Sequence, residues 1–233
     1  MEVIVFDMDD TLYDQTMPFR EAYRQIFGNR FNVDVDKLFQ LSRKYSDELF
    51  LPSQRGEISM EEVFIYRIQK AFEDMKIKIT DSEAIQFQRM YEYGQSHIHM
   101  SETIPEILTI CKRTKKLGLI SNGPSEHQWN KVKQLGVFDW IDREHIFISG
   151  DLNMAKPDAA IFLYVSNYFS VKPEQCLYIG DNYYNDVVGA KSAGWKMIWL
   201  NQHNYKIPEG GVLPDYICHT EEELLRHSIK LCL

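Results

Sequence analysis

The chain has 233 residues, 44% of them hydrophobic, and a formal net charge of -8. This size allows one full domain and a smaller inserted one, and the hydrophobic content is that of a packed globular protein rather than of a disordered chain. The negative charge disfavours general binding to nucleic acid or to anionic membranes, while a metal ion and a few basic groups can still attract a small anion into one cleft.

Other features of the sequence predict a soluble protein of the cytoplasm. The four cysteines are scattered without a C-x-x-C spacing, which favours reduced thiols. The first residues lack the basic and long apolar regions of a secretory signal, and no apolar run approaches the ~18 residues that span a bilayer. We therefore expect no membrane and no nucleic-acid partner. The sequence does not decide between a monomer and a homodimer.

Residues 3–6 form an apolar, β-branched and aromatic run that predicts a buried strand ending at a group of carboxylates. Residues 15–99 then contain no strand pattern but four helical periods in a row, which predicts an inserted helical domain. The expected helices lie at 19–27, 35–50, 60–75 and 82–97, with Asp34, Ser59 and Asp81 as expected N-caps.

From residue 104 onward, predicted strands and helices alternate. The expected strands are 117–120, 145–149, 176–179 and 196–200, with a weaker sixth at 214–218, and the expected helices are 104–116, 126–135, 159–168, 185–193 and 221–231. This alternation predicts an α/β fold with a Rossmann-like parallel sheet and helices on both faces. The expected domains are 1–14 with 100–233 for the α/β core, and 15–99 for the helical insertion.

Ligands of an open α/β sheet bind beyond the carboxyl ends of the strands, so polar residues after each apolar run are candidate site residues. Asp7 and Asp9 follow the first run and, two residues apart, would point to the same side of an extended chain. Such a pair favours a hard divalent cation or two different protonation states. Taken alone, the pair also fits a turn or a helix cap.

Two further strand ends carry polar side chains. Ser121, Asn122 and Gly123 offer a hydroxyl, an amide and a backbone that can approach phosphate closely, although Asn-Gly is also a common turn. Lys156 precedes Pro157, and a helix with proline at its first position would hold this ammonium near the strand ends. A single lysine before a helix is equally compatible with a solvated side chain.

The fourth group follows the run 176–179 and consists of Gly180 and Asp181, with Asp186 five residues further on. Taken alone, these carboxylates fit a helix N-terminus and an exposed acid. Their place after a predicted strand nevertheless brings them to the same edge of the sheet as the first group.

The order and spacing of the four groups resemble the motifs of the haloacid dehalogenase (HAD) superfamily. Its first motif is DxDx(T/V) after an apolar strand, its second a Ser or Thr that closes a strand, its third a Lys, and its fourth GDxxx(x)D. The matching residues are Asp7, Asp9 and Thr11; Ser121; Lys156; and Gly180, Asp181 and Asp186. The resemblance covers essentially the whole chain, because the helical insertion looks like the family's commonest, all-helical cap.

The resemblance implies a phosphatase that uses Mg²⁺. Asp7 would attack the phosphorus and form an aspartyl-phosphate, and Asp9 would protonate the leaving alkoxide and later activate water. Ser121 and Lys156 complete the implied catalytic set. The implied phosphate-binding residues are Thr11, Ser121, Asn122, Gly123 and Lys156, and the implied Mg²⁺ ligands are Asp7, Asp181, the backbone carbonyl of Asp9, and Asp186 through water or a hydrogen bond.

Asp9 also bears on the choice of reaction, because dehalogenases of the superfamily lack an acid at this position. We therefore expect hydrolysis of a small soluble phosphomonoester, and the sequence does not identify which one. A phosphomutase with the same core and a non-catalytic phosphate-binding or regulatory protein remain as alternatives.

Side chains of the helical insertion and its hinge are expected to have structural roles. Tyr13 is expected to pack at the hinge, Phe19 to lie in the core of the insertion, and Arg20 to lie on a solvated helix face. The remaining basic residues considered, which we also expect on solvated faces, are Arg43, Arg67 and Lys70.

Overall fold

The structure, a computed structural model, describes residues 1–232 apart from the side chain of Gln54. The chain divides into two compact units. The first, here called the sheet unit, contains Met1–Asp14 and the chain from His99 onward. The second, the helical unit, is Gln15–Ile98.

The sheet unit is built on a six-stranded sheet in the order β3-β2-β1-β4-β5-β6, in which neighbouring strands are parallel. Its strands are β1 (Val3–Phe6), β2 (Lys116–Ser121), β3 (Ile146–Ile148), β4 (Cys176–Gly180), β5 (Lys196–Leu200) and β6 (Tyr216–Cys218). All six predicted strands are therefore confirmed, the weak sixth included. Phe6 lies opposite Leu119 of β2 and Ile179 of β4, so the strand ends that carry the predicted motifs are neighbours.

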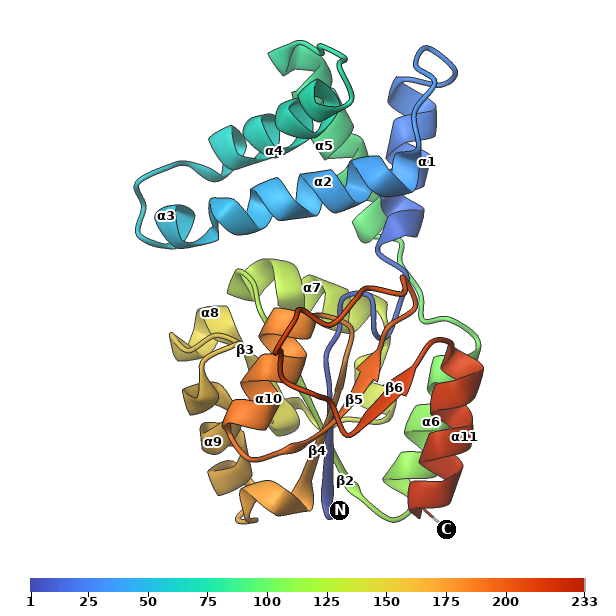
Figure 1. The fold of residues 1–233 in the computed structure, drawn as a ribbon, viewed down its shortest axis with the longest axis vertical. Coiled ribbons are helices and arrows are strands. Elements are labelled where there is room, and N and C mark those ends of the chain that lie inside the picture. Colours follow the sequence, from blue (N-terminus) through green and yellow to red (C-terminus); the bar gives the residue numbers. More distant parts are fainter. Residues whose placement is uncertain (233) are drawn as a thin grey trace. The chain divides into compact units, whose positions relative to one another are not determined.

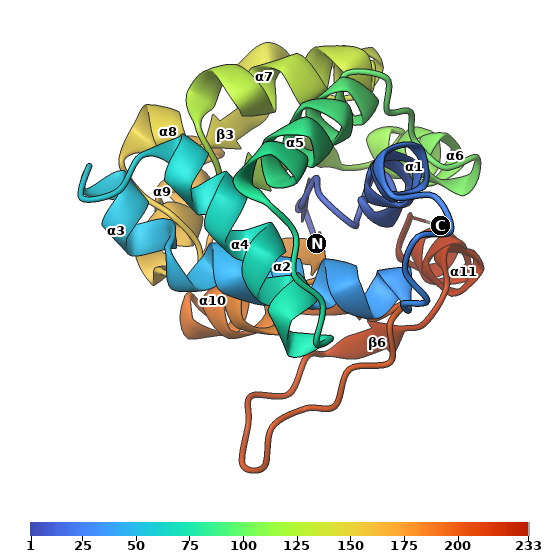
Figure 2. The ribbon, with the colours of Figure 1, turned by 90° about the horizontal axis from the view of Figure 1, so that it is seen from above.

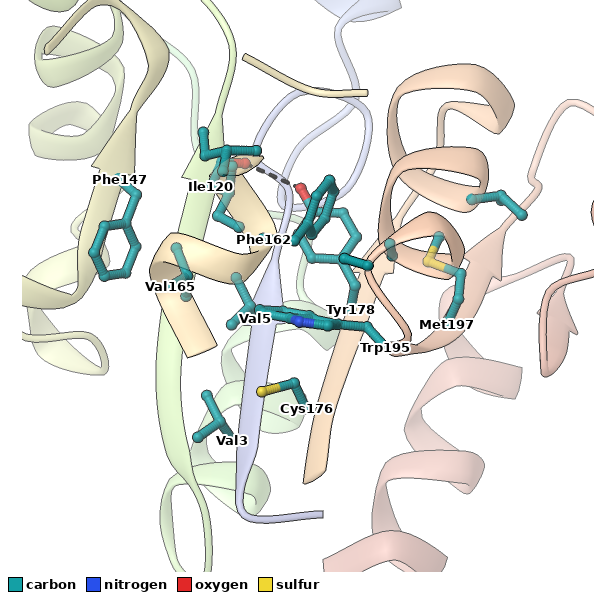
Figure 3. Close-up of a cluster of buried hydrophobic side chains, with 14 of the residues drawn as sticks. Val3, Val5, Ile120, Phe147, Phe162, Val165, Cys176, Tyr178, Trp195 and Met197 are labelled. Atoms are coloured by element: carbon teal, nitrogen blue, oxygen red, sulfur yellow. Dashed lines mark hydrogen bonds between the residues drawn. The ribbon is translucent and has the colours of Figure 1, made fainter. Parts of the chain in front are cut away.

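Helices cover both faces of this sheet, as predicted. They are α6 (Thr103–Lys112), α7 (Ser125–Gln134), α8 (Ser149–Leu152), α9 (Ala159–Tyr168), α10 (Gly189–Ser192) and α11 (Glu221–Cys232). Figure 1 shows α9 and α10 on one side of the sheet and α6 and α11, which pack on each other, on the other side. The core on the first side surrounds Val5 and includes Phe162, Val165, Tyr178 and Trp195 (Figure 3).

Two predicted helices differ from the observed ones. The helix expected at 104–116 ends at Lys112, since β2 already begins at Lys116. The helix expected at 185–193 is replaced by a π-helical turn, η4 (Tyr183–Val188), followed by α10. The helix predicted at 159–168 is confirmed as α9, but Pro157 is not its first residue, because Asp158 is the N-cap and accepts a hydrogen bond from the Ala160 N–H.

The helical unit contains α1 (Thr16–Ile26), α2 (Val35–Glu48), α3 (Phe50–Gln54), α4 (Met60–Asp74) and α5 (Asp81–Gln95). Helix α2 packs against α4, and α1 packs against α5 (Figure 2). Asp34 and Ser59 are N-caps as predicted, and Ser59 forms a capping box with Glu62. Asp81 is not a cap, because Thr80 caps α5 in a reciprocal pair with Glu83.

The expectations for Phe19 and Arg20 are confirmed, whereas that for Arg67 is wrong. Phe19 is buried in the core of the unit, with its ring against Phe39 and Phe87. Arg20 is exposed and pairs with a surface carboxylate. Arg67 is buried rather than solvated, and its guanidinium donates a hydrogen bond to Gln88 Oε1 at 2.7 Å.

Candidate functional site

The chain turns sharply within the first motif, just beyond the carboxyl end of β1. Asp10 has a φ of 55°, a left-handed conformation that aspartate tolerates better than most residues. The turn brings Tyr13 back beside Asp9, to which it is joined by an isolated β-bridge and by a hydrogen bond of 2.6 Å from the Tyr13 hydroxyl to Oδ1. We expected Tyr13 only to pack at the hinge. Its hydroxyl instead contacts Asp9, a predicted site residue.

A buried lysine joins the ends of three segments. The Lys156 ammonium donates hydrogen bonds to Asp7 Oδ1 at 2.6 Å, to Asp186 Oδ1 at 2.7 Å and to the Tyr178 hydroxyl at 2.8 Å. The lysine is 5% exposed. A lysine is rarely buried to this extent unless its charge is paired, as it is here. The Tyr178 hydroxyl in turn donates a hydrogen bond to the Ile120 carbonyl, shown as a dashed line in Figure 3.

Asn122 fixes the backbone of this lysine. Its Nδ2 donates to the Lys156 carbonyl at 2.8 Å, and its Oδ1 accepts from the Lys156 N–H at 3.0 Å. Both ends of the amide are thus used to hold the loop of the third motif, so Asn122 acts on the site through Lys156.

Asp7, Asp181 and Asp186 form an acidic cluster in which one carboxylate oxygen of each lies within 4.8 Å of the others. The neighbouring Asp186 carboxylate leaves no room for a Cβ on Gly180, so glycine is required at the end of β4. Carboxylate oxygens at this spacing are suited to a hard divalent cation. When all three carboxylates are ionised, the one ammonium leaves two negative charges, which such a cation would balance.

Burial sets the protonation of this cluster. It raises the pKa of Asp7 to about 7, against the opposing effect of the Lys156 charge. Burial, together with the Asp10 and Asp186 carboxylates, also raises the pKa of Asp181 well above its usual range. The pKa of Lys156 is lowered by burial, but the two carboxylates outweigh that effect and hold it well above its ordinary value. Lys156 is therefore a fixed cation beside Asp7.

Helix α7 supplies two side chains that the sequence patterns did not indicate. Lys131 donates from Nζ to Asp9 Oδ1 at 2.7 Å. Gln128 donates from Nε2 to Ser121 Oγ at 2.9 Å and lies 3.3 Å from Asp9 Oδ2. Polar residues three apart on a helix share a face, but nothing in the sequence distinguishes a face that meets Asp9 from one that meets water.

A buried hydroxyl completes the first motif. Thr11 is 1% exposed, and its Oγ1 has no hydrogen-bond partner among the described residues. Buried hydroxyl groups are nearly always satisfied, so an orphan at this place is a reason to expect a polar ligand nearby.

The comparisons with known proteins identify the family. The family model of haloacid dehalogenase-like hydrolases matches residues 1–194. The chain belongs to this family. The prediction of a HAD-like hydrolase is thereby confirmed. Among curated relatives, glyceraldehyde 3-phosphate phosphatase of Pyrococcus furiosus is 28% identical over 88% of this chain and 82% of its own length. Human N-acylneuraminate-9-phosphatase is 25% identical over 96% of this chain and 92% of its own length.

Solved structures show the same HAD fold. A magnesium-bound HAD-hydrolase, YfnB of Bacillus subtilis, has a TM-score of 0.72 at 22% identity over 97% of this chain and 98% of that one. A dehalogenase solved with an intermediate has a TM-score of 0.76 at 16% identity, over 97% and 96% of the two chains. None of the helices within residues 1–232 combines the length and the hydrophobicity that a membrane span requires.

The sheet unit of this HAD hydrolase brings the predicted site residues to one edge of its sheet. Lys156 contacts Asp7 and Asp186, and a carboxylate oxygen of Asp181 lies within 4.8 Å of theirs. Asp9 and Ser121 are linked through Gln128. The backbone N–H of Gly123 donates to Ser149 Oγ at 3.0 Å, so in this structure it is used within the protein. The residues missed from sequence are Tyr13, Gln128, Lys131 and Tyr178.

Proposed function

We propose that this HAD hydrolase is a Mg²⁺-dependent phosphatase for a small phosphomonoester, with Asp7 as the nucleophile. The observation that carries the proposal is the fixed contact of Asp7 with the buried Lys156 ammonium, at the edge of an acidic cluster suited to a divalent cation. A carboxylate held by one oxygen in this way is oriented for attack, and an adjacent cation offsets the charge that a phosphate group brings.

Two displacements at phosphorus account for the proposed reaction. In the first, a bond forms between an Asp7 carboxylate oxygen and phosphorus while the bond to the ester oxygen breaks, and the leaving oxygen takes a proton from Asp9. In the second, Asp9 removes a proton from water, which attacks the aspartyl-phosphate and releases Asp7. Mg²⁺ held by Asp7, Asp181 and Asp186 would neutralise charge on the phosphoryl oxygens.

Two further features favour phosphate chemistry over attack on a carbon–halogen bond. A carboxylic acid at position 9 supplies the proton that an alkoxide leaving group needs. Both relatives named above are phosphatases of small phosphorylated molecules. The substrate class proposed is therefore a small phosphorylated metabolite. The hydroxyl groups of Thr11 and Ser121 are the proposed contacts to its phosphoryl oxygens.

Hydrolysis of p-nitrophenyl phosphate tests this proposal. The pure protein is expected to turn it over with Mg²⁺ and to lose activity in excess chelator. A panel of metabolites that includes glyceraldehyde 3-phosphate and N-acylneuraminate 9-phosphate should contain a substrate with kcat/KM of about 10⁴ M⁻¹s⁻¹ or more. Formation of an isomeric phosphate without release of inorganic phosphate would favour a phosphomutase. No turnover of any member would favour a non-catalytic phosphate-binding protein.

The stability of the metal-free protein is expected to fall as the pH rises. The folded protein retains the Asp7 proton up to a pKa of about 7, whereas the unfolded chain releases it near the ordinary pKa of 3.8. The stabilisation from this group is complete below the unfolded pKa and is lost as the pH rises through the folded pKa. Mg²⁺ competes with this proton, so it should raise the melting temperature more at about pH 8 than at about pH 5.5.

Thermal melts in chelator and in Mg²⁺ at the two pH values provide the measurement. Asp7→Asn should reduce the difference between them because it removes one of the titrating carboxyls. A Mg²⁺-induced rise in melting temperature that is the same at both pH values would argue against a cation bound at this cluster.

A further inference from the structure

The Asp9 carboxylate is held by donors from outside the four motifs. Lys131 of α7 is 4% exposed, and its ammonium lies 2.7 Å from Asp9 Oδ1. The Tyr13 hydroxyl donates to the same oxygen at 2.6 Å, and Gln128 Nε2 lies 3.3 Å from Oδ2. Burying a lysine is costly without a partner, so this ion pair is a specific feature of the fold rather than a chance surface contact.

Gln128 also connects this group to the end of β2. Its Nε2 lies 2.9 Å from Ser121 Oγ and 2.6 Å from the Asn122 carbonyl. A Cβ on Gly123 would come within 2.7 Å of Gln128 Nε2, so the glycine gives the amide the space that it occupies. One turn of α7 therefore ties the second motif and Asp9 together, although Lys131 and Asp9 are 122 residues apart in sequence.

We propose that Lys131 is a positioning residue for Asp9, supported by Gln128 and Tyr13, and that it aims the Asp9 carboxylate at the leaving-group oxygen of the substrate. This inference rests on the proposed phosphatase function. Proton transfer needs the two heavy atoms within about 2.6–3.2 Å of each other, so a carboxylate that rotates away contributes little. In the first displacement, Asp9 enters with its proton on Oδ2 while Lys131 and Tyr13 hold Oδ1. That proton goes to the leaving oxygen as the phosphorus–oxygen bond breaks.

Loss of Lys131 should slow the hydrolysis of esters with poor leaving groups more than that of esters with good ones. Phenolate, with a pKa of about 10, leaves far less readily than p-nitrophenolate, so phenyl phosphate depends more on proton donation. The experiment compares kcat/KM for the two esters in Lys131→Met and in the wild type. The value of kcat/KM depends only on the steps up to transfer of the phosphoryl group to Asp7. Slow hydrolysis of the aspartyl-phosphate therefore does not affect it.

We expect kcat/KM of Lys131→Met on phenyl phosphate to fall at least about tenfold further than on p-nitrophenyl phosphate, within the range of a general acid. Tyr13→Phe removes one hydrogen bond to the same Asp9 oxygen. It should also lower kcat/KM more on phenyl phosphate than on p-nitrophenyl phosphate, but by a smaller factor. The matched control is Lys133→Met, an exposed lysine on the same helix, which should leave both constants unchanged.

The outcomes separate the inference from the function on which it rests. An equal loss on both esters in folded Lys131→Met would mean that Lys131 only supports the structure, and no loss would mean that Asp9 is held without it. Either result overturns the positioning role and leaves the phosphatase proposal standing. A wild type inactive on both esters would overturn both.

Discussion

Replacing Asp7 by asparagine is expected to lower kcat by on the order of 10⁴-fold or more, because an amide cannot form the phosphoryl-enzyme that divides the reaction. Asparagine keeps the shape of the side chain and still accepts a hydrogen bond from Lys156, so the fold should persist. Burial raises the pKa of Asp7 to about 7, so a neutral side chain is well suited to this position in the metal-free protein.

The measurement is kcat on p-nitrophenyl phosphate together with a thermal melt in chelator. Asp142→Asn is the control, because its side chain is 69% exposed and lies 3.9 Å from the His145 ring, outside the acidic cluster. The control should keep wild-type activity. Near-normal turnover by folded Asp7→Asn would remove Asp7 as the nucleophile.

Replacing Lys156 by methionine should lower both stability and activity. The change leaves the buried carboxylates of Asp7 and Asp186 without their shared cation. Removing one partner of a buried ion pair typically costs about 3–5 kcal/mol of folding free energy. For a chain of this size, that corresponds to a melting temperature about 10 °C lower. The value of kcat/KM should fall on the order of 10²-fold or more, because a fixed charge beside the phosphoryl group is lost.

A more exposed lysine serves as the control for Lys156. Lys191→Met removes a lysine that pairs with Asp215 at 2.7 Å but is 26% exposed, so it should cost about 1 kcal/mol or less. Mg²⁺ should restore more of the melting temperature in Lys156→Met than in Lys191→Met, since only the first variant exposes excess negative charge at the acidic cluster. Equal melting temperatures for the two variants would show that the buried ion pairs contribute little to stability.

Local sequence patterns predicted the elements of this fold because each pattern has a local physical cause. The apolar run of β1 stops abruptly at Asp7, and the periodicity of α9 matches its observed bounds. The same locality explains an error at the start of α5. Thr80 and Asp81 are both good cap residues, and the choice of Thr80 depends on its reciprocal pairing with Glu83.

The surroundings of Asp9 could not be predicted in this way. A helical pattern does not distinguish buried Lys131 from exposed Lys133, since both are lysines on one predicted helix. Lys131 is buried because the turn after β1, more than a hundred residues earlier, lies against α7. Arg67 illustrates the same limit in the helical unit, where its partner Gln88 comes from another helix. Polar residues are buried by tertiary contacts, to which a single sequence gives little access.

The stereochemical course at phosphorus distinguishes a covalent Asp7 intermediate from direct attack by water. A phosphorothioate monoester that is chiral through its oxygen isotopes would be hydrolysed in labelled water, and the configuration of the product would be read by ³¹P NMR. Transfer first to Asp7 and then to water comprises two in-line displacements, each of which inverts the configuration. Overall retention is therefore the expected result. Overall inversion would mean that water attacks the substrate directly, and it would contradict a covalent role for Asp7.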